Sequence, residues 1–216
     1  MGNFQAMCCS GPIENRPGRD YTPIQHAEVE YFEGHGRAEP IRMLLSHAGC
    51  KFTNKYIKME DWPQLKQDKK LYPSGGLPVL VIDGERHFET MACLRSAAIR
   101  LGYYNSKDSL ACYHADVVCD MTSDVYNQLG KCMFAPDDEA KTQEFGKFTA
   151  LINKILVFIE ESMQVNGWQF AAGNSLSPAD FCVAALYFGF CQNSAFAQNE
   201  AIKPLFDSHS QLQHYY

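Results

Sequence analysis

The chain has 216 residues, of which 46% are hydrophobic and 20% charged, and a net charge of −6 at neutral pH. This length allows one large domain or two small ones, each with a buried core. The negative charge argues against nucleic acid as a main partner, because binding to phosphates requires a basic surface. No apolar run reaches the roughly 20 residues that span a bilayer, and the first residues lack a signal-peptide pattern.

The nine cysteines are odd in number and irregularly spaced, and they form no CxxC pair. Several lie in apolar stretches, where a thiol behaves as a small hydrophobic group. These features fit a reduced, cytoplasmic protein better than a disulfide scaffold, and no zinc site is expected.

Residues 1–26 are rich in Gly, Pro, Asn and Gln and show no periodicity, which predicts a flexible arm. Its start resembles a dual-acylation signal, with myristate on Gly2 and palmitate on Cys8 or Cys9. Two acyl chains anchor a protein stably, whereas one is marginal. Ala6 stands where such signals prefer Ser or Thr, so an inert arm remains the alternative to membrane anchoring.

Residues 27–104 alternate between strand and helix patterns. The expected elements are a strand at 28–32, a helix at 39–48, a strand at 52–58, a short helix capped by Asp61, strands at 77–82 and 85–88 joined by Asp83-Gly84, and a helix at 90–102. This order, βαβ followed by a helix, a hairpin and a helix, is typical of a mixed sheet with helical cover. The prediction is an α/β thioredoxin-like N-terminal domain.

Residues 107–216 have helical periodicity throughout. Two apolar stripes predict core-facing helices. Their members are Val117, Val118, Met121, Val125 and Leu129 in the first, and Phe145, Phe148, Ile152, Ile155 and Ile159 in the second. Ser177 followed by Pro178 and Asp180 predicts the start of a third helix. We therefore expect an all-α helical-bundle C-terminal domain.

Five sequence motifs together indicate a family. They are Tyr31-Phe32 with GRAEPIR at 36–42, DWP at 61–63, GLPVL at 76–80, ETMACLR at 89–95 and GNSLSPADF at 173–181. In this order and spacing they resemble the cytosolic glutathione transferases, most closely the sigma class that includes the haematopoietic prostaglandin D synthases. The resemblance covers residues 28–216 and implies glutathione as co-substrate.

The expected chemistry is the stabilisation of a thiolate. A free thiol has a pKa of about 8.5, so little of it is ionised at neutral pH. A phenol O–H directed at the sulfur, with a cation nearby, would stabilise the anion. By their places in the family motif, Tyr31 is the expected catalytic donor, Arg37 the supporting cation and Phe32 a further glutathione contact. Without the motif, a core tyrosine and a surface arginine would be the simpler interpretation.

The resemblance also implies the residues that hold the peptide backbone of glutathione. Pro78 would be a cis-proline, so that Leu77 presents its backbone N–H and C=O to the ligand as a short sheet edge. Thr90 opens a helix whose free N–H groups would bind the γ-glutamyl carboxylate, and Glu89 would accept from the ligand's ammonium. The alternatives are a strand-starting proline and plain helix capping.

Trp62 and Lys66 lie one helical turn apart, and in the resembled class such residues contact the glycyl end of glutathione. Asp116, Asp120 and Asp124 recur every four residues, and like charges so placed repel one another. The resemblance implies that Asp124 reaches the ligand's ammonium across a homodimer. In some sigma enzymes such acids also hold a divalent ion weakly between subunits. A partly buried Trp, a solvated Lys and a solvated acidic face are the alternatives.

The chain departs from the family in several places. Gly76 stands where the family usually has Lys or Gln, Glu89-Thr90 replaces the commoner Gln-Ser, and residues 71–75 carry extra length. The family's helical domain also usually continues for about another helix beyond the equivalent of Leu212.

The expected activity is conjugation of the glutathione thiolate to small electrophiles, a detoxification reaction. Glutathione-dependent isomerisation, as in prostaglandin D synthases, and a non-catalytic role, as in the lens crystallins derived from this family, are the alternatives. A thiol–disulfide oxidoreductase fits poorly, because no cysteine begins the first helix of the domain.

Overall fold

The computed structural model describes residues 22–215, so the acylation signal predicted at Gly2, Cys8 and Cys9 lies outside the described residues. The described chain divides into two compact units, residues 22–106 and 107–215. Each unit is considered by itself below.

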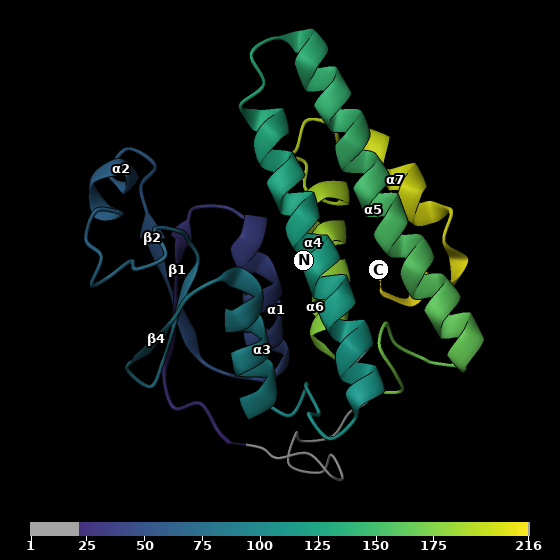
Figure 1. Cartoon of the computed structure of the whole chain (residues 1–216), viewed down its shortest axis with the longest axis horizontal. Helices are drawn as coiled ribbons and strands as arrows, with labels where there is room; N and C mark the ends of the chain where they lie inside the picture. Colours follow the sequence, from purple (N-terminus) through teal and green to yellow (C-terminus); the bar gives the residue numbers. More distant parts are fainter. Residues whose placement is uncertain (1–21, 216) are drawn as a thin grey trace. The chain divides into compact units, whose positions relative to one another are not determined.

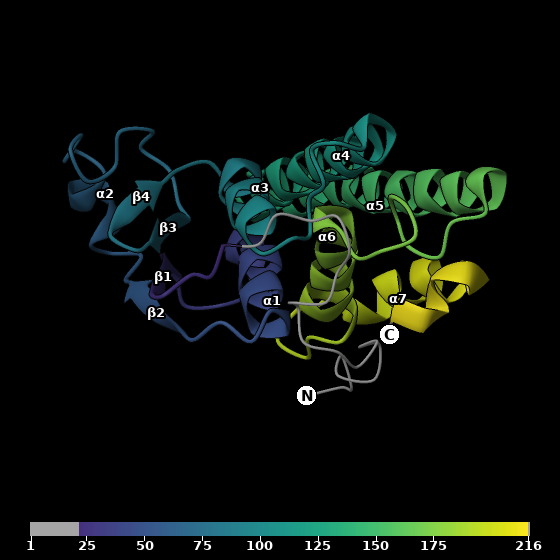
Figure 2. The same ribbon diagram turned by 90° about the horizontal axis from the view of Figure 1, so that it is seen from below.

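The first unit is built on a four-stranded mixed sheet. Its strands are β1 (Ala27–Phe32), β2 (Phe52–Ile57), β3 (Val79–Ile82) and β4 (Glu85–His87), and its helices are α1 (Glu39–His47), α2 (Trp62–Leu65) and α3 (Thr90–Arg100). The order is β2-β1-β3-β4, with β1 and β2 parallel and the other two pairs antiparallel. Helices α1 and α3 cover one face and α2 lies on the other (Figures 1 and 2). This arrangement confirms the predicted thioredoxin-like fold.

Strand β1 occupies the centre of the sheet, and successive side chains along it point to opposite faces. Val29 is fully buried on the face that carries α1 and α3, where it belongs to the same apolar core as Leu45 and Leu94. Phe32 points to the other face, where its ring meets the ring of Trp62 on α2. Strand β1 therefore contributes Val29 to the core beneath α1 and α3, and Phe32 to the face that carries α2.

The hairpin between β3 and β4 uses the two-residue turn that Asp83-Gly84 predicts. Both turn residues have positive φ, 51° and 89°, as a type I′ turn requires. The Asp83 carboxylate also accepts hydrogen bonds from the backbone N–H groups of Gln25 (2.9 Å) and His26 (2.8 Å), and from Arg100 (2.6 Å). The last residues of the segment predicted as an arm are thus attached to the sheet.

Two local predictions were wrong. The Asp61 side chain forms no capping hydrogen bond, and α2 has only four residues. Strand β3 begins at Val79 rather than at residue 77, because the Leu77–Pro78 bond is cis and Pro78 has no N–H to donate to a ladder.

The second unit is entirely helical. Its elements are α4 (Ser109–Met133), α5 (Asp138–Asn166), α6 (Pro178–Leu186), the π-helical turn η4 (Tyr187–Cys191), α7 (Asn199–Asp207) and the 3-10 segment η5 (Ser210–Tyr215). The two long helices α4 and α5 run side by side (Figure 1). Both start with an aspartate whose carboxylate accepts from a backbone N–H of the first turn: Asp108 from Ala111 and Asp137 from Ala140. The predicted helical domain is confirmed.

The first predicted apolar stripe is only partly buried. Val118 and Val125 are fully buried, but Val117, Met121 and Leu129 are half-buried, and Cys119 and Tyr126 take their places in the core. The second stripe packs as predicted from Phe148 onward.

Helix α6 begins at a buried carboxylate. Asp180 is 1% exposed and accepts hydrogen bonds from the backbone N–H groups of Ala171 (2.9 Å) and Ser177 (2.6 Å) and from the Ser177 hydroxyl (2.8 Å). The predicted capping motif therefore forms and also ties the preceding loop to α6.

The seven described cysteines are all free thiols. Within residues 22–215, no helix is both long enough and apolar enough to cross a bilayer.

The turn between β1 and α1 brings Gly36 against Tyr31. Gly36 has φ +54°, and a Cβ atom there would lie 2.7 Å from the Tyr31 hydroxyl oxygen. That oxygen accepts a hydrogen bond from the backbone N–H of Arg37, at 3.2 Å. Only glycine at this position leaves room for the phenol.

Gly36→Ala should therefore destabilise the protein more than Gly49→Ala. Gly49 has a similar φ of +71° but has nothing within 4 Å of its added Cβ. Each alanine should cost about 1 kcal/mol for the left-handed backbone. Gly36→Ala should cost about 1 kcal/mol more, because the displaced phenol loses its bond to Arg37. Urea denaturation measures both, and equal losses would contradict the close contact.

Candidate functional site

The pairing of β1 with β3 places the predicted phenol beside the predicted proline. Glu30 of β1 pairs with Val79 of β3 in antiparallel register, so the next residues in line are Tyr31 and Pro78. The Leu77–Pro78 peptide bond is cis, as expected from the motif. Tyr31 is half-buried, and Pro78 is buried. The end of β1 and the residues leading into β3 thus lie side by side at one end of the sheet.

The oxygen of Tyr31 is held as a hydrogen-bond acceptor. The Arg37 backbone N–H donates to it, which leaves the phenol proton able to be donated to another acceptor. The supporting role predicted for the side chain of Arg37 stays a prediction. A further guanidinium, that of Arg42, lies over the Tyr31 ring, 5.9 Å from the ring centroid.

Arg42 is fixed by several contacts around its guanidinium. It donates to the Gly34 carbonyl (2.6 Å), the Asn54 side chain (2.8 Å) and the Glu39 carboxylate (3.2 Å). Burial raises the pKa of Glu39, but hydrogen bonds and charges from His35 and Arg42 outweigh that effect and hold the pKa below its usual range. The hydrogen bond to Glu39 in turn raises the pKa of His35. The sequence motif contained Arg42, but its role came only from the geometry.

A row of aromatic rings leads away from Tyr31 along the face that carries α2. The Tyr31 and Phe32 ring centroids are 5.4 Å apart, those of Phe32 and Trp62 6.0 Å, and those of Trp62 and Tyr72 5.1 Å. The last two contacts are edge-to-face, an arrangement that aromatic rings favour. Phe32 and Trp62, both predicted as glutathione contacts, therefore touch one another.

Lys66 follows α2 directly and is half-buried. Its carbonyl accepts from the Lys69 side chain at 3.1 Å. Gly76 is half-buried too, and its backbone does not adopt a positive φ. Residues 66–77 lie between α2 and β3 and form the loop that connects the predicted lysine to the cis-proline.

Glu89 and Thr90 lie at the start of α3. Glu89 is exposed, has φ 66° and accepts through its carbonyl from the Cys93 N–H at 2.8 Å. Thr90, the first residue of the helix, is 8% exposed. The first N–H groups of a helix are unsatisfied by the helix itself, which suits them to an anionic ligand.

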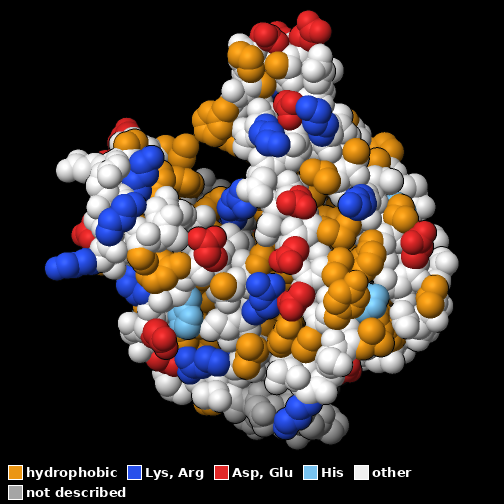
Figure 3. All heavy atoms as spheres, viewed as in Figure 1, with side chains coloured by type: hydrophobic (Ala, Val, Ile, Leu, Met, Phe, Trp, Pro, Cys, Tyr) orange, Lys and Arg blue, Asp and Glu red, His pale blue; other side chains and the backbone are white. Residues whose placement is uncertain are grey.

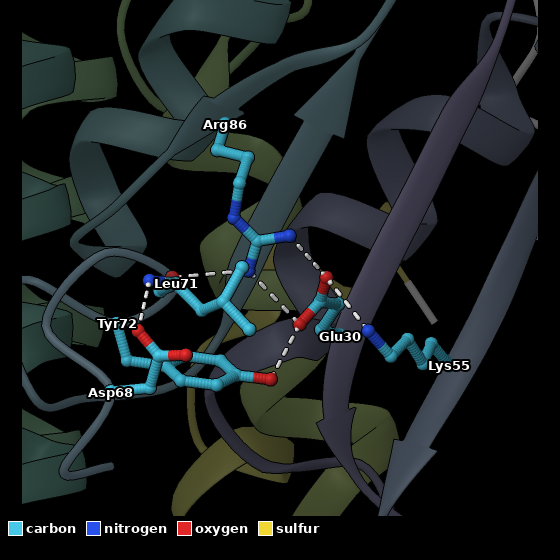
Figure 4. Close-up of polar contacts among 6 residues, drawn as sticks. All are labelled: Glu30, Lys55, Asp68, Leu71, Tyr72 and Arg86. Atoms are coloured by element: carbon cyan, nitrogen blue, oxygen red, sulfur yellow. Dashed lines mark hydrogen bonds and ion pairs between the residues drawn. The ribbon is translucent and has the colours of Figure 1, made fainter. Parts of the chain in front are cut away.

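A buried carboxylate that the sequence did not predict as part of the site lies next to Tyr31. Glu30 is fully buried and bonds the Tyr72 hydroxyl (2.9 Å) and the Arg86 guanidinium (2.6 and 3.2 Å), with Lys55 at 3.3 Å (Figure 4). The available signal was a glutamate between Val29 and Tyr31 in a strand, with an arginine on the return strand of the hairpin. In the sheet, one strand, β3, lies between Glu30 on β1 and Arg86 on β4, so the pairing could be found only from the strand order.

Acidic side chains follow one another along the surface of α4 (Figure 3). Asp120 and Asp124 are exposed and Asp116 is half-buried. Asp124 lines an open hollow of about 580 Å³ with Asn127, Gln128, Lys131 and Leu151. Within residues 22–215, no three acidic, His or Cys side chains lie close enough together to hold a metal ion. A divalent site would therefore need a second chain, and it stays a prediction.

Two thiols of the first unit, the buried Cys93 and the half-buried Cys50, are poorly suited to act as nucleophiles. Burial raises the pKa of Cys93 to about 12 and also raises the pKa of Cys50. Both groups therefore stay protonated at neutral pH, and protonated thiols react slowly.

Comparison with known proteins finds one family model and several relatives that the chain matches. Residues 27–96 match the model of the glutathione S-transferase N-terminal domain. The chain is 31% identical over 171 residues to the class-mu 28 kDa glutathione S-transferase of Schistosoma mansoni, which covers 75% of this chain and 77% of that protein. It is 30% identical over 143 residues to S-crystallin SL11 of Nototodarus sloanii, covering 64% and 68%.

Solved structures show the same fold. The sigma-class glutathione transferase of Fasciola hepatica superposes with a TM-score of 0.60 at 28% identity, covering 88% of this chain and 94% of that one. The prostaglandin synthase D of Nilaparvata lugens superposes with a TM-score of 0.66 at 23% identity, covering 88% and 94%. Together with the cis-proline beside Tyr31 and the two-unit fold, these similarities establish that the chain belongs to the glutathione S-transferase family.

Proposed function

We propose that this protein is a glutathione transferase that conjugates the thiolate of glutathione to small electrophiles. The observation that carries the proposal is the Tyr31 hydroxyl, held by the Arg37 N–H at 3.2 Å and adjoining the cis bond of Leu77 and Pro78. The relatives of the chain include proteins named glutathione S-transferases.

Glutathione would bind at the end of the sheet where β1 finishes and the segment leading into β3 begins. The Leu77 backbone would pair with the peptide as an added strand, and Trp62 and Lys66 would hold the glycyl carboxylate. Thr90 and the first N–H groups of α3 would hold the γ-glutamyl carboxylate, with Glu89 accepting from the ammonium. These contacts would leave the sulfur next to Tyr31 and Phe32.

Catalysis would then consist of stabilising the anion before it attacks. The thiol releases its proton to solvent, and the Tyr31 O–H donates a hydrogen bond to the sulfur. The Arg42 cation above the Tyr31 ring favours negative charge nearby. The sulfur electron pair forms a bond to the electrophilic carbon, and the leaving group departs with its own electron pair.

Two other functions have specific support. The fold is shared with a protein named prostaglandin synthase D, which keeps glutathione-dependent isomerisation as a candidate. The relation to an S-crystallin keeps a non-catalytic role as the candidate from a different class. Retention on immobilised glutathione, followed by an aryl-halide conjugation assay, separates the three: turnover supports the transferase, retention alone an isomerase, and no retention the non-catalytic relative.

Tyr31→Phe should lower the conjugation rate at saturating glutathione about 100-fold, because one donor to a developing anion is worth about that much. The ultraviolet absorbance of the bound thiolate should titrate at higher pH in the variant. Tyr56→Phe is the matched control, since Tyr56 pairs with Tyr31 across the sheet and also lies under Arg42, at 6.0 Å. Equal effects of both substitutions, or none of either, would reject the role of Tyr31.

We further propose that the protein works as a homodimer in which Asp124 of one subunit contacts the ammonium of glutathione bound to the other. Light scattering should then give twice the chain mass of 24.4 kDa. Asp124→Ala should weaken glutathione affinity about tenfold, the loss expected for one charged hydrogen bond, while Asp120→Ala should not. A monomer with unchanged affinity in Asp124→Ala would contradict this arrangement.

The location proposed is the cytoplasm, with attachment to membranes if the arm is acylated. Metabolic labelling with a myristate analogue should mark the wild type and not Gly2→Ala, and palmitate labelling should require Cys8 or Cys9. Absence of label from the wild type would leave an inert arm on a protein free in the cytoplasm.

A further inference from the structure

We propose that Glu30 is a positioning residue for glutathione: through Tyr72 and Arg86 it fixes the loop 66–77, whose two ends carry the predicted glutathione contacts Lys66 and Leu77. The inference rests on the proposed function and extends it to a network that touches no substrate atom.

Glu30 reaches the middle of the loop by two separate routes (Figure 4). Its carboxylate accepts from the Tyr72 hydroxyl at 2.9 Å. It also accepts two bonds from Arg86, whose guanidinium donates to the Leu71 carbonyl at 3.1 Å. One side chain and one backbone atom of the loop are thereby tied to the central strand of the sheet.

The attachment reaches the predicted glutathione contacts through packing. The Arg86 guanidinium lies 5.6 Å over the Tyr72 ring, and that ring meets Trp62 edge-on at 5.1 Å. Trp62 in turn packs on Phe32, which adjoins Tyr31. A shift of Tyr72 would therefore move Trp62 and loosen the loop between Lys66 and Leu77.

The loop also has order of its own, onto which this attachment is added. The Asp68 carboxylate accepts from the N–H groups of Lys70 (3.0 Å) and Leu71 (3.2 Å), and the Asp68 carbonyl accepts from Tyr72 N–H at 2.8 Å. These bonds shape the turn but do not hold it to the sheet. The hydrogen bonds that Glu30 makes with Tyr72 and Arg86 attach the loop to the sheet.

The network is intact at neutral pH. Burial raises the pKa of Glu30, but bonds from Arg86 and Tyr72 and the charges of Arg86 and Lys55 outweigh it, so the pKa lies below its usual value of 4.5. Burial and the neighbouring carboxylate raise the pKa of Tyr72 to about 12, so its hydroxyl keeps the proton that it donates. A lowered carboxylate pKa means that the attachment is present above about pH 4.5 and is lost only as the pH falls through the pKa of the folded protein.

Two variants of the full chain test the proposal. Glu30→Gln removes the charge at nearly constant shape, and Tyr72→Phe removes only the hydroxyl and keeps the ring. Each should raise the KM for glutathione about tenfold, because the ligand must then order the loop itself, while kcat changes less than twofold. Amide hydrogen exchange of residues 66–77 should accelerate in both variants.

Asp180→Asn is the control for general destabilisation, because its carboxylate is equally buried but its bonds go to Ala171 and Ser177. It should lower the denaturation midpoint without raising the KM or accelerating exchange in the loop. Unchanged KM and exchange in both test variants, or the same changes in Asp180→Asn, would overturn the proposal. If the wild type itself fails to bind glutathione, the proposed function is rejected instead. The role of Glu30 is tested only by the comparison of the variants with the wild type.

Discussion

A carboxylate buried in the centre of a sheet must be paired to stay ionised, because an isolated charge in a protein interior costs several kcal/mol, a large part of a domain's entire stability. Glu30 meets this requirement with a guanidinium, a hydroxyl and an ammonium from three different segments. Removing one partner of such a cluster typically costs 3–5 kcal/mol. The strand that carries Glu30, the hairpin that carries Arg86 and the loop that carries Tyr72 are consequently held in one arrangement.

Successive side chains of β1 point to opposite faces of the sheet, so the same strand contributes to the sites on both faces. Glu30 and Phe32 point toward α2, and Tyr31, between them, lies beside the turn to α1. The phenol oxygen can approach the Arg37 N–H only because residue 36 has no Cβ. Gly36 thus leaves room for the Tyr31 phenol. The buried carboxylate that must be paired belongs to the residue just before Tyr31, Glu30.

Two of the departures expected from the family pattern lie in this loop. They are Gly76 and the extra length at 71–75. Arg86 contacts the loop at Leu71, the first residue of that longer stretch. A longer loop has more conformations to lose on folding, and the attachment to Glu30 limits that freedom where the additional residues begin.

The sequence by itself determined the order of the elements, the two-unit fold and the family, because apolar periodicity, turn residues such as Asp83-Gly84 and five ordered motifs are local signals. It also predicted the cis bond at Pro78 and the helix start at Thr90, because both residues occupy motif positions. It could not reveal that the Arg42 guanidinium lies over the Tyr31 ring, since side-chain direction depends on how α1 packs. The contacts of Glu30 with Tyr72 and Arg86, 42 and 56 residues away, were decided only by the tertiary structure, because strand order brings distant residues together without leaving a periodic trace in the chain.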